Sequence, residues 1–289
     1  MAKLMGVDVP PEKMEDILNS LNIDATLAGD EFTCEPPAWR QDIETEADLA
    51  EEVLRLYGYD FIPSTLPKGE TMLGECSKKQ LFQDRVKDTL VGLGFFEALN
   101  YSFVSPKWLD AMGFIPGDWR LDPLPVRNPL GEDTSVMRTT MAPSMLAALT
   151  TNVSRGNQEV RLFELSNAFR KTDAHQLPEE IPTLMLGMYG EGVDFYQLRD
   201  GVVCLLNRFG IEAKVEAGGE GWLHPGRKAR ILAGTIDLGQ MGEVHPDIAA
   251  RFDLENRRVY VAELILSQMM EAEKPVPEVK ALPRFPAVS

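Results

Sequence analysis

The sequence predicts an α+β fold in two parts, and three observations lead to this prediction. Apolar residues recur at helical spacing in several segments that begin with a capping residue or a proline. In the second half, apolar strand-like segments are separated by short glycine turns, which favour antiparallel pairing, and regular βαβ alternation is not seen. A stretch rich in Pro, Gly and Thr separates a small module, residues 1–72, from a core, residues 73–289, with the boundary near Leu73.

The N-terminal module is predicted to contain two helices and a strand. The first helix, within residues 10–23, follows two prolines and has an apolar face consisting of Met14, Ile17, Leu18 and Leu21. A strand is expected within residues 30–37. The second helix, residues 45–57, has Thr45 as its N-cap with Asp48 three residues later, which resembles a capping box. Its expected apolar stripe consists of Leu49, Val53, Leu56 and Tyr57.

The core is predicted to combine helices with short strands. Helices are expected after Ser77, which has Gln80 three residues later, at Pro143, and after Asp194. His245-Pro246 should open a further short helix. Strands are expected within residues 97–105, 159–171, 182–190, 229–239, 240–246 and 258–266.

Composition limits the possible functions. The chain has 289 residues, with 29 Lys and Arg against 45 Asp and Glu, and a formal charge of −16. This negative charge argues against a protein that binds nucleic acid by itself. The three cysteines, Cys34, Cys76 and Cys204, form no C-x-x-C pair, so a reducing, cytoplasmic setting is expected. No apolar run is long enough to span a bilayer, and the N-terminus lacks a secretory signal, so no membrane is expected among the partners.

The most informative local pattern is the acidic block RQDIETEADLAEEVLR. On the predicted helix Asp48, Glu51 and Glu52 share one side, and Asp42 precedes it closely. Clustered carboxylates suit Mg²⁺. The same residues could instead stabilise the helix dipole or pair with Arg55, and spacing alone leaves both interpretations open.

Other chemical motifs are weak or missing. The three histidines, His175, His224 and His245, accompany no nucleophile elbow and no H-E-x-x-H pair, and neither common glycine-rich phosphate loop occurs. The segment GWLHPGRKAR concentrates basic residues in a predicted turn. Such a turn could contact a phosphate, although a solvated basic turn is the commoner case.

The chain resembles the β-subunit family of bacterial phenylalanyl-tRNA synthetases. The resemblance begins with PPAWRQDIETEADLAEEVLRLYGYDFIPSTLP, which is similar to the module that precedes the core in that family. It continues through GLGFFEALNYSFVS, NPLGEDTSVMRTTMAPSMLAAL, NVSRGNQEVRLFELSNAF, DFYQLRDGVV, HPGRKARI, MGEVHP and RFPAVS, and so covers nearly the whole chain. Because these blocks occur in order, the resemblance is highly specific.

The resemblance implies a class II synthetase-like core that is not itself catalytic. In that family an α₂β₂ heterotetramer attaches phenylalanine to tRNA(Phe) with ATP, and α carries the active site. This chain has the motif-two-like strand RLFELSNAFRK, but GTIDLGQMGEVHP lacks the catalytic arginine of an active core. We therefore expect no catalytic residue here and ATP use only by the holoenzyme. The family's Mg²⁺ site shared with α would fall on Asp42, Asp48, Glu51 and Glu52.

Further expectations concern the extent of the chain and its contacts. The chain looks like a fragment of β, because the upstream tRNA-binding and editing modules and the C-terminal anticodon-binding domain have no counterpart, so editing cannot be assigned. The helix at 78–93 and the strand near 97–103 would occupy the place of the class II dimerisation motif, so its exposed apolar residues should form the contact with α, with Leu90 and Phe95 as the positions to test. Two alternatives remain: a nucleic-acid-binding module in the first 70 or so residues, and an independent metal-dependent enzyme.

Overall fold

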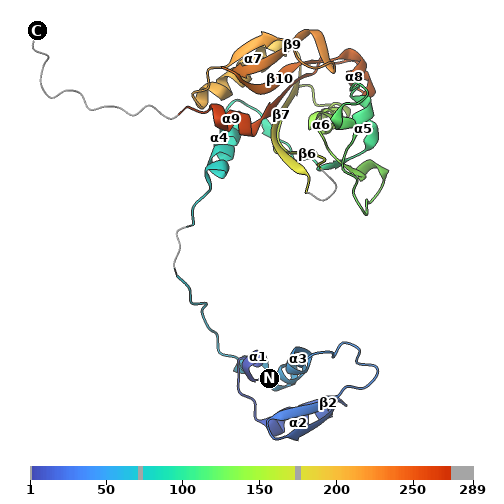
Figure 1. Ribbon diagram of the computed structural model, residues 1–289, viewed down its shortest axis with the longest axis vertical. Coiled ribbons are helices and arrows are strands. Elements are labelled where there is room, and N and C mark those ends of the chain that lie inside the picture. Colours follow the sequence, from blue (N-terminus) through green and yellow to red (C-terminus); the bar gives the residue numbers. More distant parts are fainter. Residues whose placement is uncertain (1, 71–73, 173–176, 275–289) are drawn as a thin grey trace, which may run out of the picture. The chain divides into compact units, whose positions relative to one another are not determined.

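The chain folds into two compact units, Met1–Gly74 and Glu75–Ser289. This computed structural model describes residues 2–70, 74–172 and 177–274 (Figure 1). The boundary expected near Leu73 lies outside the described residues, as do His175 and the segment RFPAVS.

The first unit packs helices against a two-stranded antiparallel hairpin. Its elements are α1 (Ala2–Met5), α2 (Pro11–Ser20), β1 (Asp24–Ala28), β2 (Glu31–Glu35), α3 (Glu46–Tyr57) and the 3₁₀ helix η1 (Tyr59–Phe61). Leu18, Ile23 and Val53 are fully buried and join the helices to the hairpin in one apolar cluster. These contacts give the small unit a core of its own.

Both predicted helices of this unit are confirmed, but one strand was missed and one residue of a predicted helix face was wrong. Strand β1 was not predicted, because its sequence DATLA is too short and too mixed to show alternation. Leu56, expected in the apolar stripe of α3, is exposed, whereas Glu52 is buried on that helix. Arg40 and Arg55 both pair with Glu52, which makes its burial possible.

The second unit is built on a seven-stranded sheet, which confirms the predicted α+β class. The strand order is β3-β6-β7-β11-β10-β9-β8. In that order the bounds are Phe96–Glu97, Val160–Arg170, Glu179–Tyr189, Tyr260–Ile265, Ile236–Val244, Leu223–Ala233 and Lys214–Ala217. The pairs are antiparallel except for the short edge strand β3, which pairs with β6 in parallel.

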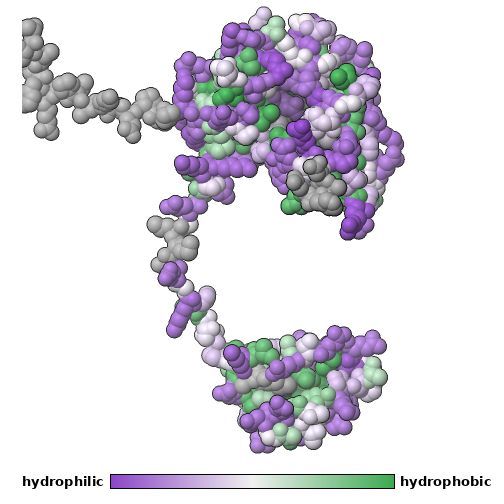
Figure 2. All heavy atoms as spheres, in the orientation of Figure 1, coloured by the Kyte–Doolittle hydropathy of each residue, from purple (hydrophilic) through white to green (hydrophobic). Residues whose placement is uncertain are grey.

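Helices cover both faces of this sheet (Figure 1). The helices are α4 (Lys78–Gly92), α5 (Pro106–Ala111), α6 (Ala142–Ser154), α7 (Phe195–Arg208), α8 (Pro246–Arg251) and α9 (Leu266–Ala272). Alternate residues of β7 point to opposite faces: Leu184 and Leu186 join the cluster under α4, α7 and α9, whereas Met185 joins the cluster under α6 and α8. Hydrophilic residues cover much of the visible surface (Figure 2).

Local capping signals in the core were predicted well. Ser77 caps α4 and accepts a hydrogen bond from the Gln80 backbone, and Asp194 caps α7 in the same way through the Gln197 backbone. The helix at Pro143 and the short helix after His245 are also present. Side-chain caps are local interactions, which is why sequence spacing suffices to find them.

Two strand predictions in the core were wrong. Residues 97–105 do not form one strand; β3 ends at Glu97, and Phe103–Val104 (β4) pairs with Val136–Met137 (β5). Residues 229–239 do not form one strand either, because the chain turns at Gly234, whose φ is +61°. The basic segment expected to be a turn therefore lies within strand β9.

Within the described ranges, no helix combines the length and the hydropathy that crossing a membrane requires.

Candidate functional site

The acidic block of the first unit is held by arginines. Both Arg40 Nε and Nη2 donate to the Asp42 carboxylate, at 3.0 and 2.7 Å, and Nη2 also lies 3.0 Å from Glu52 Oε1. The other oxygen of Glu52 accepts a 2.6 Å bond from Arg55 Nη2. The hydrogen bond from Arg40 lowers the pKa of Asp42, and that from Arg55, followed by Arg40, lowers the pKa of Glu52 despite its burial. Both carboxylates are therefore ionised and paired at neutral pH.

Asp48 has a structural task in the same block. Its Oδ2 accepts hydrogen bonds from Thr45 N at 2.7 Å, Thr45 Oγ1 at 2.8 Å and Glu44 N at 3.0 Å. These bonds, with the Thr45 side chain first, lower the pKa of Asp48 and fix the start of α3. Glu51 is exposed on the next turn.

The four carboxylates do not form a closed ligand set in this chain. Among the described residues, no group of three or more His, Cys, Asp and Glu is arranged to hold a metal ion. The donor types suit Mg²⁺, but Asp42 and Glu52 face guanidinium groups, and Asp48 is used as a helix cap. The residues as they stand here therefore do not fit a resident Mg²⁺ ion.

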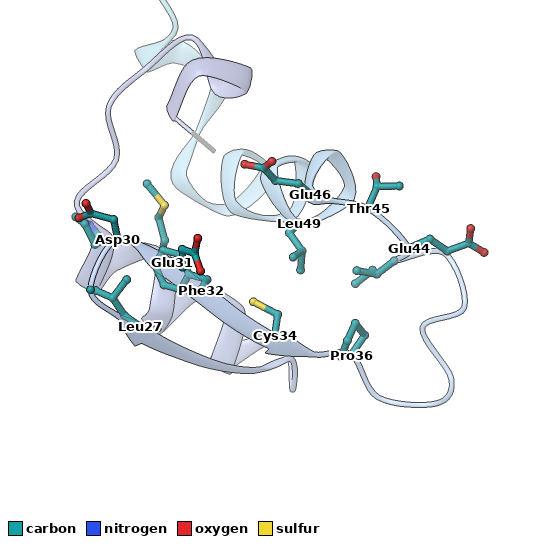
Figure 3. A pocket seen from close by; sticks show the side chains of 14 residues that line it. Leu27, Asp30, Glu31, Phe32, Cys34, Pro36, Glu44, Thr45, Glu46 and Leu49 are labelled. Atoms are coloured by element: carbon teal, nitrogen blue, oxygen red, sulfur yellow. The ribbon is translucent and has the colours of Figure 1, made fainter.

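A cavity of about 750 Å³ lies beside this block, between the hairpin and the start of α3 (Figure 3). Leu27, Phe32, Cys34 and Leu49 form its apolar wall, and its acidic lining residues are Asp30, Glu31, Glu44 and Glu46. Within the part of the chain that the structure describes, none of the four predicted metal ligands lines it, and neither does any Lys or Arg. Its charge makes it unsuited to phosphate.

The core unit has a cavity of about 690 Å³ over the sheet face that carries α6 and α8. Two guanidinium groups line it, and both are neutralised: Arg120 by Asp118 and Glu220, and Arg230 by Asp237. At its floor Glu263 accepts a 2.7 Å hydrogen bond from Thr140 Oγ1, and burial raises the pKa of this carboxyl group. A triphosphate would find little free positive charge there.

A second polar group lies under the opposite sheet face. The Glu243 carboxylate is 4% exposed and accepts two hydrogen bonds from Arg227, at 2.6 and 2.9 Å, and two from Arg258, at 3.0 and 2.7 Å. Burial raises the pKa of Glu243, but these bonds outweigh it and lower the pKa to about 2. Sequence reasoning missed this cluster, because its members lie on three strands or strand ends far apart in the chain.

This cluster predicts a specific sensitivity to acid. The pKa of Glu243 is lowered to about 2 from its ordinary 4.5, so its contribution to stability is complete above pH 5 and is lost as the pH falls from about 4.5 towards 2. We expect Glu243→Gln to lower the free energy of unfolding at pH 7 by up to about 3 kcal/mol, with the difference from wild type shrinking across that window. Urea unfolding at pH 7, 4 and 3 measures it. Glu159→Gln, which removes an exposed carboxylate, is the control, and a pH-independent difference for Glu243→Gln would contradict the prediction.

The free edge of the sheet exposes apolar side chains. Phe96, Leu99 and Tyr101 are 73%, 87% and 74% exposed at and just after edge strand β3. Leu90 and Phe95, which were predicted to contact another subunit, are 0% and 5% exposed and belong to the core. Leu90 and Phe95 are therefore wrong as contact residues, and the exposed apolar residues of the same segment follow directly after these two. The available signal in the sequence was the spacing of Leu99 and Tyr101, which stand two residues apart in a predicted strand.

Two family models match the chain. The one described as the phenylalanyl tRNA synthetase beta chain CLM domain matches residues 62–266, and the one described as the tRNA synthetase B5 domain matches residues 1–59. They adjoin at residues 59–62, within the first compact unit.

Curated relatives and solved structures agree with these matches. The phenylalanine–tRNA ligase beta subunits of Clostridium tetani and Clostridium acetobutylicum are 37% and 38% identical over 100% and 99% of this chain. The chain spans about a third of their length, 36% in each case. A crystal structure of pyrrolysyl-tRNA synthetase from Desulfitobacterium hafniense matches with a TM-score of 0.55 at 13% identity, covering 67% of this chain and 68% of that one. This likeness shows a common class of fold.

Proposed function

Because the chain belongs to the phenylalanyl-tRNA synthetase β-chain family, we propose that it is the non-catalytic partner of a catalytic α subunit. The complete enzyme would be an α₂β₂ heterotetramer that attaches phenylalanine to tRNA(Phe) with ATP. In this proposal the chain supports the assembly and performs no chemical step. The observation that carries the partner role is the exposed apolar edge of Phe96, Leu99 and Tyr101, since such patches on a folded unit mark protein interfaces.

The non-catalytic role is supported by the charges of the core cavity. Arg120 and Arg230 are both paired with carboxylates, and Glu271 adds a further carboxylate to the lining. Strand β10, residues 236–244, carries no arginine. A nucleoside triphosphate would meet repulsion here, so we propose that ATP is bound by α and not by this chain.

Assembly tests the proposal directly. We expect the full chain to co-purify with the phenylalanyl-tRNA synthetase α subunit encoded in the same genome when the two are co-expressed. The tagged chain without α should show no stabilisation by ATP beyond that of a matched salt. Failure to capture a folded α subunit would overturn the partner role.

The nucleic-acid-binding alternative is disfavoured by charge. Residues 1–74 contain 16 Asp and Glu but only five Lys and Arg. Affinity for phosphates comes from clustered cations, and this unit has the opposite balance. A gel-shift titration of the chain alone with tRNA and with duplex DNA, at two salt concentrations, tests this alternative. Tight, salt-dependent binding would support it.

The setting that we propose is the cytoplasm. The three cysteines, all within the described residues, are free thiols, which is in keeping with a reducing compartment.

We also keep Asp42, Asp48, Glu51 and Glu52 as the proposed contribution of this chain to a Mg²⁺ site shared with α. The isolated chain does not fit the ion, because Arg40 and Arg55 already neutralise two of these carboxylates. The site would therefore need ligands from α and a displaced Arg40. The support is the donor chemistry of the block together with membership of the family.

This proposal predicts a Mg²⁺ response that depends on assembly. MgCl₂ should raise the melting temperature of the chain alone no more than NaCl of matched ionic strength, and should raise that of the α–β assembly further. Glu51→Gln/Glu52→Gln should abolish the extra shift, whereas Glu31→Gln/Glu35→Gln on strand β2 should leave it unchanged. Comparing the two salts within each variant cancels any change in basal stability. Equal Mg²⁺ responses from both double variants would leave the block as a solvated, arginine-paired helix face.

A further inference from the structure

The contact segment, residues 99–102, lies between strands β3 and β4 and belongs to neither. It carries the exposed side chains of Leu99 and Tyr101. Within the described part of the chain, the hydrogen bonds of this segment all run to Arg138 or Glu164, which are 0% and 1% exposed. The contact segment is therefore held by a buried ion pair and not by a neighbouring strand.

Asn100 makes the shortest of these hydrogen bonds. Its Nδ2 donates to Glu164 Oε2 at 2.6 Å, while Arg138 Nη1 donates to the other carboxylate oxygen at 2.9 Å. The backbone N of Asn100 also lies 3.4 Å from Glu164 Oε1. An amide suits this place, because it donates to the second oxygen without adding a charge to the pair. Asn100 is thus the link between the contact segment and the interior.

Arg138 holds the other end of the contact segment. Its backbone N donates to Ser102 O at 2.8 Å, and its Nη1 makes a longer contact of 3.5 Å with Tyr101 O. The guanidinium group is itself fixed by Glu164 and, through Nε, by the Asn167 carbonyl at 2.9 Å. Both of these acceptors belong to strand β6, so the contact segment is anchored to the sheet.

The inward bond of Asn100 turns its two neighbours outward. Side chains alternate in direction along a strand-like chain, and Leu99 and Tyr101, on either side of Asn100, are 87% and 74% exposed. The Tyr101 ring also stacks on Phe103, with the ring centroids 5.1 Å apart and 16° between the planes. The two exposed side chains therefore have a defined arrangement in the chain alone.

We propose that Asn100 is a positioning residue for the α contact: by tying the contact segment to Glu164, it presents Leu99 and Tyr101 in a fixed arrangement. This inference rests on the proposed function, since it names what holds the surface that α would bind. A surface that is already ordered loses less conformational freedom on binding, so its affinity is higher without any added contact. Loosening the segment should then weaken binding even when both exposed side chains are kept.

Asn100→Ala tests the positioning role in the full chain. We expect it to weaken capture of α at least about tenfold, because the contact segment has to be ordered during binding. Asn167→Ala is the matched control, since it removes another amide–carboxylate bond of 2.6 Å, from Asn167 Nδ2 to Glu180 on the neighbouring strand. The control should bind α as the wild type does. Equal affinities of the two variants for α would overturn the proposal.

Proteolysis of the chain without α reads the order of the contact segment directly. Cleavage by chymotrypsin after Leu99 or Tyr101, located by mass spectrometry, requires the segment to open locally, and Asn100→Ala should speed it at least about tenfold. Tyr189→Phe is the control for general loss of stability, because it removes a buried hydroxyl that donates to Asn157 O at 3.0 Å. It should leave this cleavage at the wild-type rate. Unchanged cleavage in Asn100→Ala, or equal acceleration in Tyr189→Phe, would overturn the positioning role.

A double-mutant cycle separates positioning from direct contact. If Asn100 acts through its two neighbours, adding Asn100→Ala to Leu99→Ala/Tyr101→Ala should weaken α by less than about twofold more. A further loss as large as that of Asn100→Ala alone would show that Asn100 acts on α independently, and would overturn the proposal.

The cleavage assay also separates this inference from the proposed function. If the wild-type chain captured no α while Asn100→Ala still sped cleavage, the partner role would fail and the anchoring of the contact segment by Asn100 would stand. If the wild type captured α and Asn100→Ala changed neither capture nor cleavage, the partner role would stand and the positioning role would fail.

Discussion

Replacing Arg138 with methionine should lower the free energy of unfolding of the core unit by about 3–5 kcal/mol. Arg138 and Glu164 are 0% and 1% exposed, and Arg138 Nη1 lies 2.9 Å from Glu164 Oε1. Arg138 Nε also donates to the Asn167 carbonyl at 2.9 Å. The substitution would leave the Glu164 carboxylate in an interior site without its cation, and the desolvation cost of that charge is no longer offset. Urea unfolding followed by far-ultraviolet circular dichroism measures the change.

Two further variants test the physical reason for this loss. Arg161→Met breaks the exposed pair with Glu159 and should cost less than about 1 kcal/mol. Arg138→Met combined with Glu164→Leu removes both charges and should recover much of the stability. Arg138→Met could instead lower the free energy of unfolding no more than Arg161→Met does. That result would contradict the prediction that an unpaired charge in the interior is strongly destabilising.

Leu99→Asp together with Tyr101→Asp should weaken capture of the α subunit by at least about 100-fold. Both side chains are largely exposed, so the chain should still fold, whereas an interface would have to bury two new charges. Pull-down or calorimetric titration of α with the variant chain gives the affinity, and an unchanged melting temperature establishes the fold. Leu90→Asp or Phe95→Asp would not test this contact, because both side chains are buried in the core.

Leu130→Asp is the matched control, since Leu130 is 97% exposed elsewhere in the same unit. It should bind α as the wild type does. If both variants bound α equally well, the apolar edge would not be the contact surface, and another face of the unit would have to be sought.

The elements that sequence predicted correctly depend on local interactions. The caps at Ser77 and Asp194 lie within three residues of their partners, and the apolar face of α2 follows helical spacing. Long strands such as β6 and β7 were recognised because they are rich in apolar residues. The overall α+β class follows from such elements and from the short turns between them.

The parts that sequence could not predict depend on tertiary partners. Leu99 and Tyr101 look like strand residues, but no strand of the described chain pairs with them. For the acidic block, spacing placed Glu51 and Glu52 on one helix but could not show that Glu52 is buried between Arg40 and Arg55. The cluster around Glu243 draws on residues 227 and 258, which only the sheet brings together.

The parallel pairing of β3 with β6 has a consequence for the order in which the core assembles. Strands β9 and β10 are joined by a tight turn, whereas Phe96 pairs with Leu162, 66 residues later in the chain. Closing that long loop costs more chain entropy than closing a hairpin, and only two residues of β3 repay it, so we expect this edge to form after the hairpins. Because β3 has only two residues, few pairing contacts stabilise this edge of the sheet. An α subunit that docks on Leu99 and Tyr101 would thus engage only chains whose cores are complete, and subunit association would act as a checkpoint on folding.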